Sequence, residues 1–269
     1  PDEAARRADL KTLKRFVREN ADALCEAISR DYGHRSTHET RLAEVLPELI
    51  QLRRHIHRHP ELSGHEQQTA ALVAGELRRW GWQVREGVGR TGVLAELGPE
   101  QGPDGLPAPL VALRVDMDAL PVEERTGLDY ASTQQGLMHA CGHDLHTAVG
   151  LGVAYLLAEL AERHPELLTA RVRLLFQPAE ETAQGAAWMK ADGAMDGVAA
   201  LFGVHVFPSL PAGTIGVRSG SLTAAALCER LTNLRQPRSR LLYTLPGRLP
   251  FFRGKILLVP LCMHGISAI

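Results

Sequence analysis

The sequence predicts an α/β fold: a three-layer sandwich with a mostly parallel central sheet and an extra N-terminal helix. Two observations support this prediction. From residue 82 onward, segments typical of strands alternate with segments whose apolar residues have helical spacing. The 269 residues are also 45% hydrophobic and 23% charged, which is enough apolar material to bury the core of one or two domains.

Helices are expected first. Residues 4–32 have apolar positions at helical spacing and end before Gly33, and two further helices are expected in "LPELIQLRRHIHRHPEL" and "HEQQTAALVAGELRRWGW". Strands follow in "WQVREGV", "TGVLAEL" and "PLVALRVDM". A helix over about 144–164, the strand "ARVRLLFQ", a short helix near 183–190 and the strand "AALFGVHVF" complete the series.

Polar groups follow the predicted strands. One predicted strand ends in Arg114, Asp116 and Asp118, a second is followed by Glu180 and Glu181, and a third has His205 near its end. The segment "HACGHD" lies in the loop that leads into the long helix. Because the chemistry of such sheets gathers at the carboxyl ends of the strands, we expect these groups to converge on one edge.

Their residue types favour a metal site. A thiol nucleophile and its base usually come from separate elements, whereas Cys141 and His143 are two apart on one loop and would face a third group. Thiolate, imidazole and carboxylate are favoured ligands of zinc and similar ions. A Cys-x-His pair taken alone leaves an inert structural role equally open.

The pair Glu180 and Glu181 also has two interpretations. Acids after Pro178 fit an ordinary helix start, where they interact favourably with the helix dipole. Adjacent residues on an extended turn point different ways, so one carboxylate could bind metal while its neighbour deprotonates a water.

Five segments together resemble one enzyme family. They are "RRHIHRHPEL", "LRVDMDALP", "MHACGHDLHT", "LLFQPAEE" and "GVHVFPSLPAGTIGVRSG", in this order between about residues 46 and 226. They resemble the metal-dependent amidohydrolases that include bacterial hippurate hydrolases, N-acyl-amino-acid amidohydrolases and plant auxin-conjugate hydrolases. The resemblance implies a metallopeptidase-like catalytic domain with two divalent ions per site, zinc or manganese, or else cobalt or nickel.

The same resemblance implies the functional residues. Metal ligands would be Cys141, His143, Glu181 and His205, with Glu180 as general base and Asp116 as a carboxylate that orients a ligand. The implied reaction hydrolyses the amide bond of an N-acyl or N-aroyl amino acid, such as hippurate, to a carboxylic acid and an amino acid. This small-molecule substrate is the expected partner.

Structural roles are expected for other polar residues nearby. Helix-surface, packing or loop positions are expected for the remaining histidines: His55, His57, His59, His139 and His146. Glu66, near a helix start, is expected to cap that helix.

The resemblance divides the chain into residues 1–45, 46–226 and 227–269. The first part resembles, through "DYGHRSTHETRLAEV", the N-terminal helical segment of coniferyl-aldehyde-type aldehyde dehydrogenases, without the core that dehydrogenase activity needs. The last part is an unmatched tail with seven Lys or Arg and one acidic residue. The family's lid and dimerisation domain and its final metal-binding histidine are expected to be absent. A working amidohydrolase and a truncated or fused chain that binds metal without turnover both stay open.

Composition disfavours other classes of function. The chain has a formal net charge of -1, and no nucleic-acid-recognition motif accompanies its basic tail, so no nucleic-acid partner is expected. An apolar run of about 18 residues and an N-terminal signal core are both absent from the sequence, so no membrane partner is expected. Four scattered cysteines lack the spacing of a disulfide framework, which predicts a cytoplasmic location.

Overall fold

The computed structural model describes residues 37–207, 214–217, 241–244 and 256–261. Their contacts divide the chain into two units, Pro1–Gln51 and Leu52–Ile269. Within the first unit, the described residues form the start of helix α3 (Thr37–Arg58), which begins earlier than the sequence predicted. The helix expected at residues 4–32 lies outside the described residues.

The second unit contains alternating helices and strands. In chain order these are α4 (Gln67–Arg79), β1 (Gln83–Val88), β2 (Gly92–Leu97), β3 (Leu110–Asp116), α5 (His143–Arg163), a short 3-10 helix (Pro165–Leu167), β4 (Arg171–Gln177), α6 (Gly185–Ala191), β5 (Val198–Val206), β6 (Thr214–Val217), β7 (Leu241–Thr244) and β8 (Ile256–Leu261). The α/β class is therefore confirmed, and α4 to β5 lie within a few residues of the predicted ranges. Strands β7 and β8 fall in the tail, where the sequence pattern predicted none.

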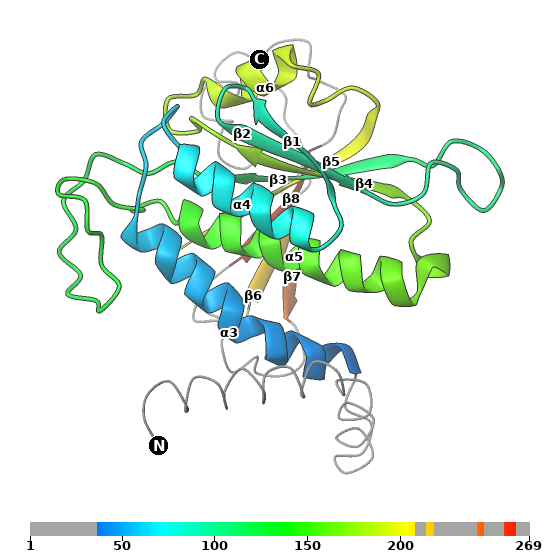
Figure 1. Ribbon diagram of the computed structural model, residues 1–269, viewed down its shortest axis with the longest axis horizontal. Coiled ribbons are helices and arrows are strands. Elements are labelled where there is room, and N and C mark those ends of the chain that lie inside the picture. Colours follow the sequence, from blue (N-terminus) through cyan, green and yellow to red (C-terminus); the bar gives the residue numbers. More distant parts are fainter. Residues whose placement is uncertain (1–36, 208–213, 218–240, 245–255, 262–269) are drawn as a thin grey trace. The chain divides into compact units, whose positions relative to one another are not determined.

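The described strands form one mixed sheet in the order β1-β2-β4-β3-β5-β8-β6-β7 (Figure 1). Strand β3 pairs in parallel with β4 and β5, and β6 with β8, while the other pairings are antiparallel. The prediction of a mostly parallel sheet is therefore corrected to a mixed one. Residues 89–91 join β1 to β2 as a tight turn, which permits only antiparallel pairing, and β8 runs antiparallel to β5.

Helices α4 and α5 pack beside each other on one face of the sheet (Figure 1). Gly150 of α5 comes so close to the sheet that a Cβ there would lie 2.9 Å from Val115 and 3.0 Å from Phe176. Successive strand residues face opposite ways, so the neighbouring Leu175 faces away from α5. On that second face, residues of α6 and the following loop join an apolar cluster: Leu94, Ala112, Leu175, Met189 and Ala194. A complete three-layer sandwich stays a prediction.

Helix α5 is a core helix. Its length and its mean hydropathy of 1.2 would by themselves allow it to cross a bilayer, alone among the helices of the described residues. Its Leu151 and Ala154, however, are fully buried in the protein, and so are the polar side chains of its first turn. This burial explains its apolar composition without a membrane.

Replacing Gly150 by Ala is expected to destabilise the protein by about 1–3 kcal/mol, because the added methyl group overlaps Val115 and Phe176. Gly75 of α4 is the matched control, since it is exposed and nothing lies within 4 Å of where its Cβ would be. Gly75→Ala is expected to stabilise the protein by roughly 0.5–1 kcal/mol through helix propensity. Urea unfolding followed by circular dichroism measures both changes. Equal effects would contradict the close approach of α5 to the sheet.

Candidate metal centre

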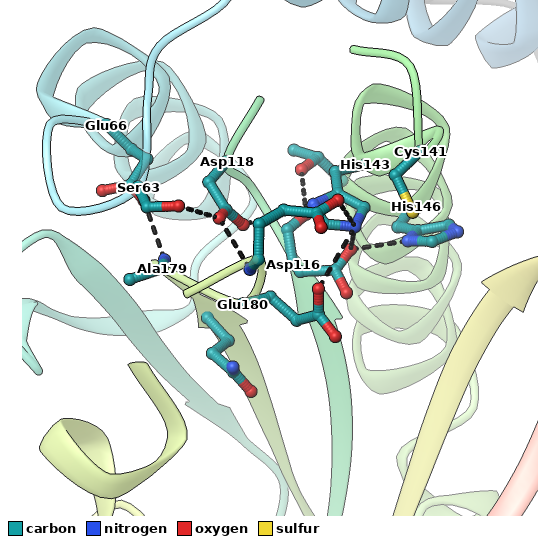
Figure 2. Close-up of polar contacts among 12 residues, drawn as sticks. Ser63, Glu66, Asp116, Asp118, Cys141, His143, His146, Ala179 and Glu180 are labelled. Atoms are coloured by element: carbon teal, nitrogen blue, oxygen red, sulfur yellow. Dashed lines mark hydrogen bonds and ion pairs between the residues drawn. The ribbon is translucent and has the colours of Figure 1, made fainter. Parts of the chain in front are cut away.

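The predicted site residues meet where the central strands end. Asp116, the last residue of β3, is in register with Gln177, the last residue of β4, and His205 is the second to last residue of β5. Helix α5 begins at His143, and its first turn faces these strand ends (Figure 2). The parallel arrangement of β4, β3 and β5 thus gathers side chains from three strand ends and one helix start, as the sequence predicted.

Cys141, His143 and His205 form one cluster of potential ligands. They offer a sulfur and two ring nitrogens that lie within 4.8 Å of one another. The Sγ of Cys141 is 3.7 Å from Nε2 of His205, whose Nδ1–H donates to the carbonyl oxygen of Val206 at 2.8 Å. Ligand atoms about 2.0 Å (nitrogen) and 2.3 Å (sulfur) from one tetrahedral zinc ion lie roughly 3.5 Å apart, so this spacing fits a shared cation.

His143 also belongs to a second cluster, with Glu180 and Glu181. Its Nε2 lies 3.6 Å from Oε1 of Glu181 and 3.7 Å from Oε2 of Glu180. Within the described residues, this Nε2 and the Oε1 of Glu181 are both buried and have no hydrogen-bond partner. Buried polar atoms without a partner are costly, and a divalent cation between them would satisfy both. The donor set therefore fits a metal ion, and the two clusters are continuous through His143.

Asp118 fixes the orientation of the His143 ring. Nδ1–H of His143 donates to Oδ1 of Asp118 at 3.2 Å (Figure 2). Oδ2 of Asp118 accepts hydrogen bonds from the Ser63 hydroxyl at 2.6 Å and from the Glu181 N–H at 3.0 Å. Burial opposes ionisation of Asp118, but these hydrogen bonds outweigh it and lower the pKa of the carboxyl. Asp118 therefore stays ionised and directs Nε2 of His143 into the cluster.

The local charges favour a cation at this place. Burial alone would lower the pKa of His143, but the hydrogen bond to Asp118, the nearby Cys141 sulfur and the charge of Asp116 raise that pKa to about 11. The neighbouring His143 and His205 rings lower the pKa of the Cys141 thiol against the effect of burial. A thiolate is the form of cysteine that binds metal. The groups around His143 thus favour a positive charge at this place.

Asp116 contacts a histidine for which the sequence predicted only a structural role. Oδ1 of Asp116 accepts a hydrogen bond from Nδ1–H of His146 at 2.5 Å and lies 3.7 Å from Nε2 of His143. Nε2 of His146 accepts the N–H of Val206 at 2.9 Å. Both ring nitrogens of His146 are thus engaged by the protein, and the ring links the end of β3 to the end of β5 beside His205. That Asp116 orients a metal ligand stays a prediction.

Glu180 stands at the open side of the cluster. Its side chain is 35% exposed, and its Oε1 lies 3.9 Å from Nη2 of Arg114. Burial raises the pKa of Glu180, as do the charges of Asp116 and Glu181, whereas Arg114 opposes the rise. A partly exposed carboxylate with a raised pKa suits the uptake and return of a proton.

Glu180 and Glu181 lie on a tightly wound turn, so the interpretation of Pro178 as an ordinary helix start is wrong. The turn connects β4 to α6, which begins only at Gly185. Ala179 and Ala183 have φ angles of 49° and 56°, in the left-handed region. At Gly185 a Cβ would lie 1.6 Å from the carbonyl oxygen of Pro178, so only glycine fits.

His57 belongs to a buried polar network that the sequence did not predict. It is 3% exposed; its Nδ1–H donates to Oδ2 of Asp144 at 2.8 Å, and its Nε2 lies 3.1 Å from Oε1 of Glu124. Nε of Arg53 lies 2.7 Å from the same Asp144 oxygen. Burial alone would lower the pKa of His57, but the hydrogen bonds to Asp144 and Glu124 raise it. The network ties the end of α3 and the loop containing Glu124 to the first turn of α5.

His55, His59 and His139 lie outside the two clusters, and their structural roles stay predictions. His59 donates from Nδ1–H to the carbonyl oxygen of His55 at 2.8 Å, one turn earlier in α3. His139 is 4% exposed, its ring nitrogens have no hydrogen bond within the described residues, and burial lowers its pKa to about 4.

The sequence pattern of Peptidase family M20/M25/M40 matches residues 112–254, more than half of the chain. The chain belongs to this family. The matched range contains both clusters of the candidate metal centre and continues past residue 226. It includes none of residues 1–45, so the aldehyde dehydrogenase resemblance is unsupported.

Relatives in this family include enzymes and a metal-binding protein. An N-acetyl-L-cysteine deacetylase of Bacillus subtilis is 46% identical over 184 residues, which cover 68% of this chain and 42% of that protein. An IAA-amino acid hydrolase of Arabidopsis thaliana is 47% identical over 176 residues, or 65% of this chain and 36% of that protein. The crystal structure of a dinuclear metal-binding M20 peptidase from Bacillus subtilis superposes with a TM-score of 0.57 at 40% identity, covering 64% of this chain and 48% of that chain. The chain thus spans less than half the length of these relatives.

The His57 network predicts a pH dependence of stability. The folded pKa of His57 is above its ordinary value of 6.5, so its contribution is fully present below about pH 6.5 and is lost as the pH rises through the folded pKa. The unfolding free energy of the parent should therefore exceed that of His57→Gln by more at pH 6 than at pH 9. Urea titrations at both pH values measure this difference. His65→Gln, at an exposed histidine, is the control and should show no such change. A difference for His57→Gln that is constant with pH would contradict the assignment.

Proposed function

We propose that the protein hydrolyses the amide bond of N-acyl amino acids with the help of divalent metal ions. The observation that carries the proposal is the pair of clusters that share His143, with unpaired donor atoms facing one another and Glu180 beside them. Membership of Peptidase family M20/M25/M40 and the relatives named for hydrolysis of acylated amino acids support the same reaction.

In this proposal Cys141, His143, Glu181 and His205 hold the metal. The chemistry that a divalent ion held by these residues would supply is polarisation of the scissile carbonyl and a lower pKa for a water molecule. Glu180 takes a proton from that water at its carboxylate and returns it to the nitrogen of the leaving amino acid. Its raised pKa favours this transfer, and the nearby charge of Arg114 opposes a larger rise.

The substrate class follows from the reaction and the relatives. We propose N-acyl and N-aroyl amino acids, with N-benzoylglycine (hippurate) as the simplest aroyl example. Zinc and manganese are the proposed ions, two per site, because thiolate and imidazole suit zinc and carboxylates suit manganese. The alternative, a chain that binds metal without hydrolysis, is distinguished by measuring metal binding and turnover separately on the same preparation.

Cys141→Ala is expected to weaken metal affinity by roughly 100-fold or more, because a ligand is lost. Zinc affinity is measured by competition with a chelator of known affinity. The control is Cys25→Ala, which lies outside the family match and should bind like the parent. Parent-like affinity of Cys141→Ala would remove Cys141 from the ligand set.

Glu180→Gln is expected to lower kcat for N-benzoylglycine by about 100- to 10,000-fold with little change in metal affinity, because the amide cannot accept the proton. The neighbouring Glu181→Gln is the matched variant and should lose metal affinity instead. Measuring kcat and zinc affinity on both variants separates base from ligand. An active Glu180→Gln enzyme would refute the base assignment. A parent that binds zinc tightly and releases no benzoate would support the inactive alternative.

A further inference from the structure

We infer that Glu66 is a positioning residue whose buried carboxylate holds the backbone of the turn that carries Glu180 and Glu181. Its hydrogen bonds do not involve the rings of His143 and His205, and it acts through main-chain N–H groups. The hydrogen-bonding role is independent of the reaction. Its consequence for catalysis rests on the proposed function.

The Glu66 carboxylate is fully buried, at 0% exposure. Its Oε1 accepts a hydrogen bond from the N–H of Ala179 at 2.8 Å (Figure 2). The same oxygen accepts the N–H of Gly64, also at 2.8 Å. Its Oε2 accepts a hydrogen bond from the Thr91 hydroxyl. A carboxylate withdrawn from water is tolerated when hydrogen-bond donors replace the solvent, and here three parts of the chain supply them.

Glu66 does not cap helix α4, so the expectation from sequence is wrong. It occupies the N-cap position, but its side chain makes no capping hydrogen bond to the first turn. The side chain points instead to the turn after β4, which is 113 residues further along the chain. A capping function could be performed at the surface and would not require complete burial.

The N–H group that donates to Glu66 belongs to a conformationally constrained residue of the turn. Ala179 has a φ of 49°, a left-handed conformation that alanine rarely adopts, and it directly precedes Glu180. Such a conformation persists only where surrounding contacts impose it. The hydrogen bond to Glu66 is one such contact.

Asp118 holds the turn on the other side of Glu180. Its Oδ2 accepts the N–H of Glu181 at 3.0 Å. The two N–H groups that flank Glu180 are therefore each fixed by a carboxylate, as Figure 2 shows for Glu66 with Ala179 and for Asp118. The short segment 63–66 connects these carboxylates, because Ser63 donates to Asp118 and Gly64 donates to Glu66. Together they set the direction in which the Glu180 and Glu181 side chains leave the backbone.

Hydrogen exchange on the full chain, without added metal or substrate, tests the backbone role directly. Glu66→Leu replaces the glutamate by an apolar side chain of similar size and so removes the hydrogen-bond acceptor. The Ala179 amide should therefore exchange about 10-fold faster or more. Glu66→Gln retains a carbonyl oxygen that can accept this N–H and should exchange like the parent. Thr91→Val is the matched control, because it removes the donor to Oε2 and leaves Ala179 bonded to Oε1. Thr91 is partly exposed, so water can replace its hydroxyl.

Peptides from β3 report on global unfolding in the same experiment. If Glu66→Leu exchanges fast throughout, Glu66→Asp decides, because its shortened carboxylate withdraws from Ala179 while the charge remains. Faster exchange confined to residues 178–184 in either variant supports the inference. Parent-like exchange at Ala179 in Glu66→Leu, or in Glu66→Asp where that variant decides, overturns it. The inference is also overturned if Thr91→Val accelerates Ala179 exchange as much as Glu66→Leu does. The effect would then come from a general connection between loops and not from the hydrogen bond to Ala179.

Turnover gives the second readout. With saturating zinc, Glu66→Leu should lower kcat for N-benzoylglycine by about 10-fold or more while KM changes little, and Glu66→Gln should restore kcat. An equal loss of kcat in Glu66→Gln would overturn a role through hydrogen bonding. A parent without turnover would count against the proposed function alone, because the exchange measurement still decides whether Glu66 holds the turn.

Discussion

The buried carboxylate of Asp118 is the constraint on which the candidate site depends most. It accepts hydrogen bonds from Ser63, from the ring of His143 and from the backbone of Glu181, three segments that are far apart in sequence. An ionised carboxylate inside a protein must replace the water that it loses, so these donors cannot be absent without a large cost. The hydrogen bonds that Asp118 accepts therefore fix the start of α5 relative to the turn after β4.

Electrostatics then explains why this arrangement favours a cation. The hydrogen bond to Asp118 and the negative charges of Asp116 and Asp118 help to raise the His143 pKa to about 11 against the effect of burial. Glu180 and Glu181 add two further carboxylates 3.7 Å and 3.6 Å from Nε2 of His143. A proton on His143 is one way to balance the carboxylates, and a divalent ion is a better one, because it also satisfies the buried atoms that lack hydrogen bonds. Burial raises the pKa of Glu180, and the charges of Asp116 and Glu181 raise it further, so the carboxylates that favour a cation also affect the residue proposed for proton transfer.

The sequence predicted what local pattern and motif can express. Periodicity predicted α4 to β5, and the positions of Asp116, Glu181 and His205 after strands predicted that they would meet, because parallel strands end at one edge. Pairing between distant strands has no local signature, which is why the mixed character of the sheet and the strands β7 and β8 were missed. The role of Glu66 was missed for the same reason: Ala179 is 113 residues away, and only the folded chain brings them together. The only signal in the sequence was an acidic residue close after "RRHIHRHPEL", inside the range that the family resemblance covers.

Each element that carries a predicted ligand is held by a carboxylate that is itself no predicted ligand. Asp118 and Glu66 hold the turn of Glu181, Asp116 holds His146 against the end of β5 beside His205, and Asp144 ties the first turn of α5 to His57. Asp116 and Asp144 are paired with arginine and histidine, whereas Glu66 and Asp118 accept most of their hydrogen bonds from backbone N–H and hydroxyl groups. Dipolar donors orient a carboxylate without neutralising it, so the negative potential that attracts a metal ion survives while the ligands stay fixed. Ligand geometry and cation affinity are thus supplied by the same buried acids, and a site of this kind has to be assembled by the whole sheet edge at once.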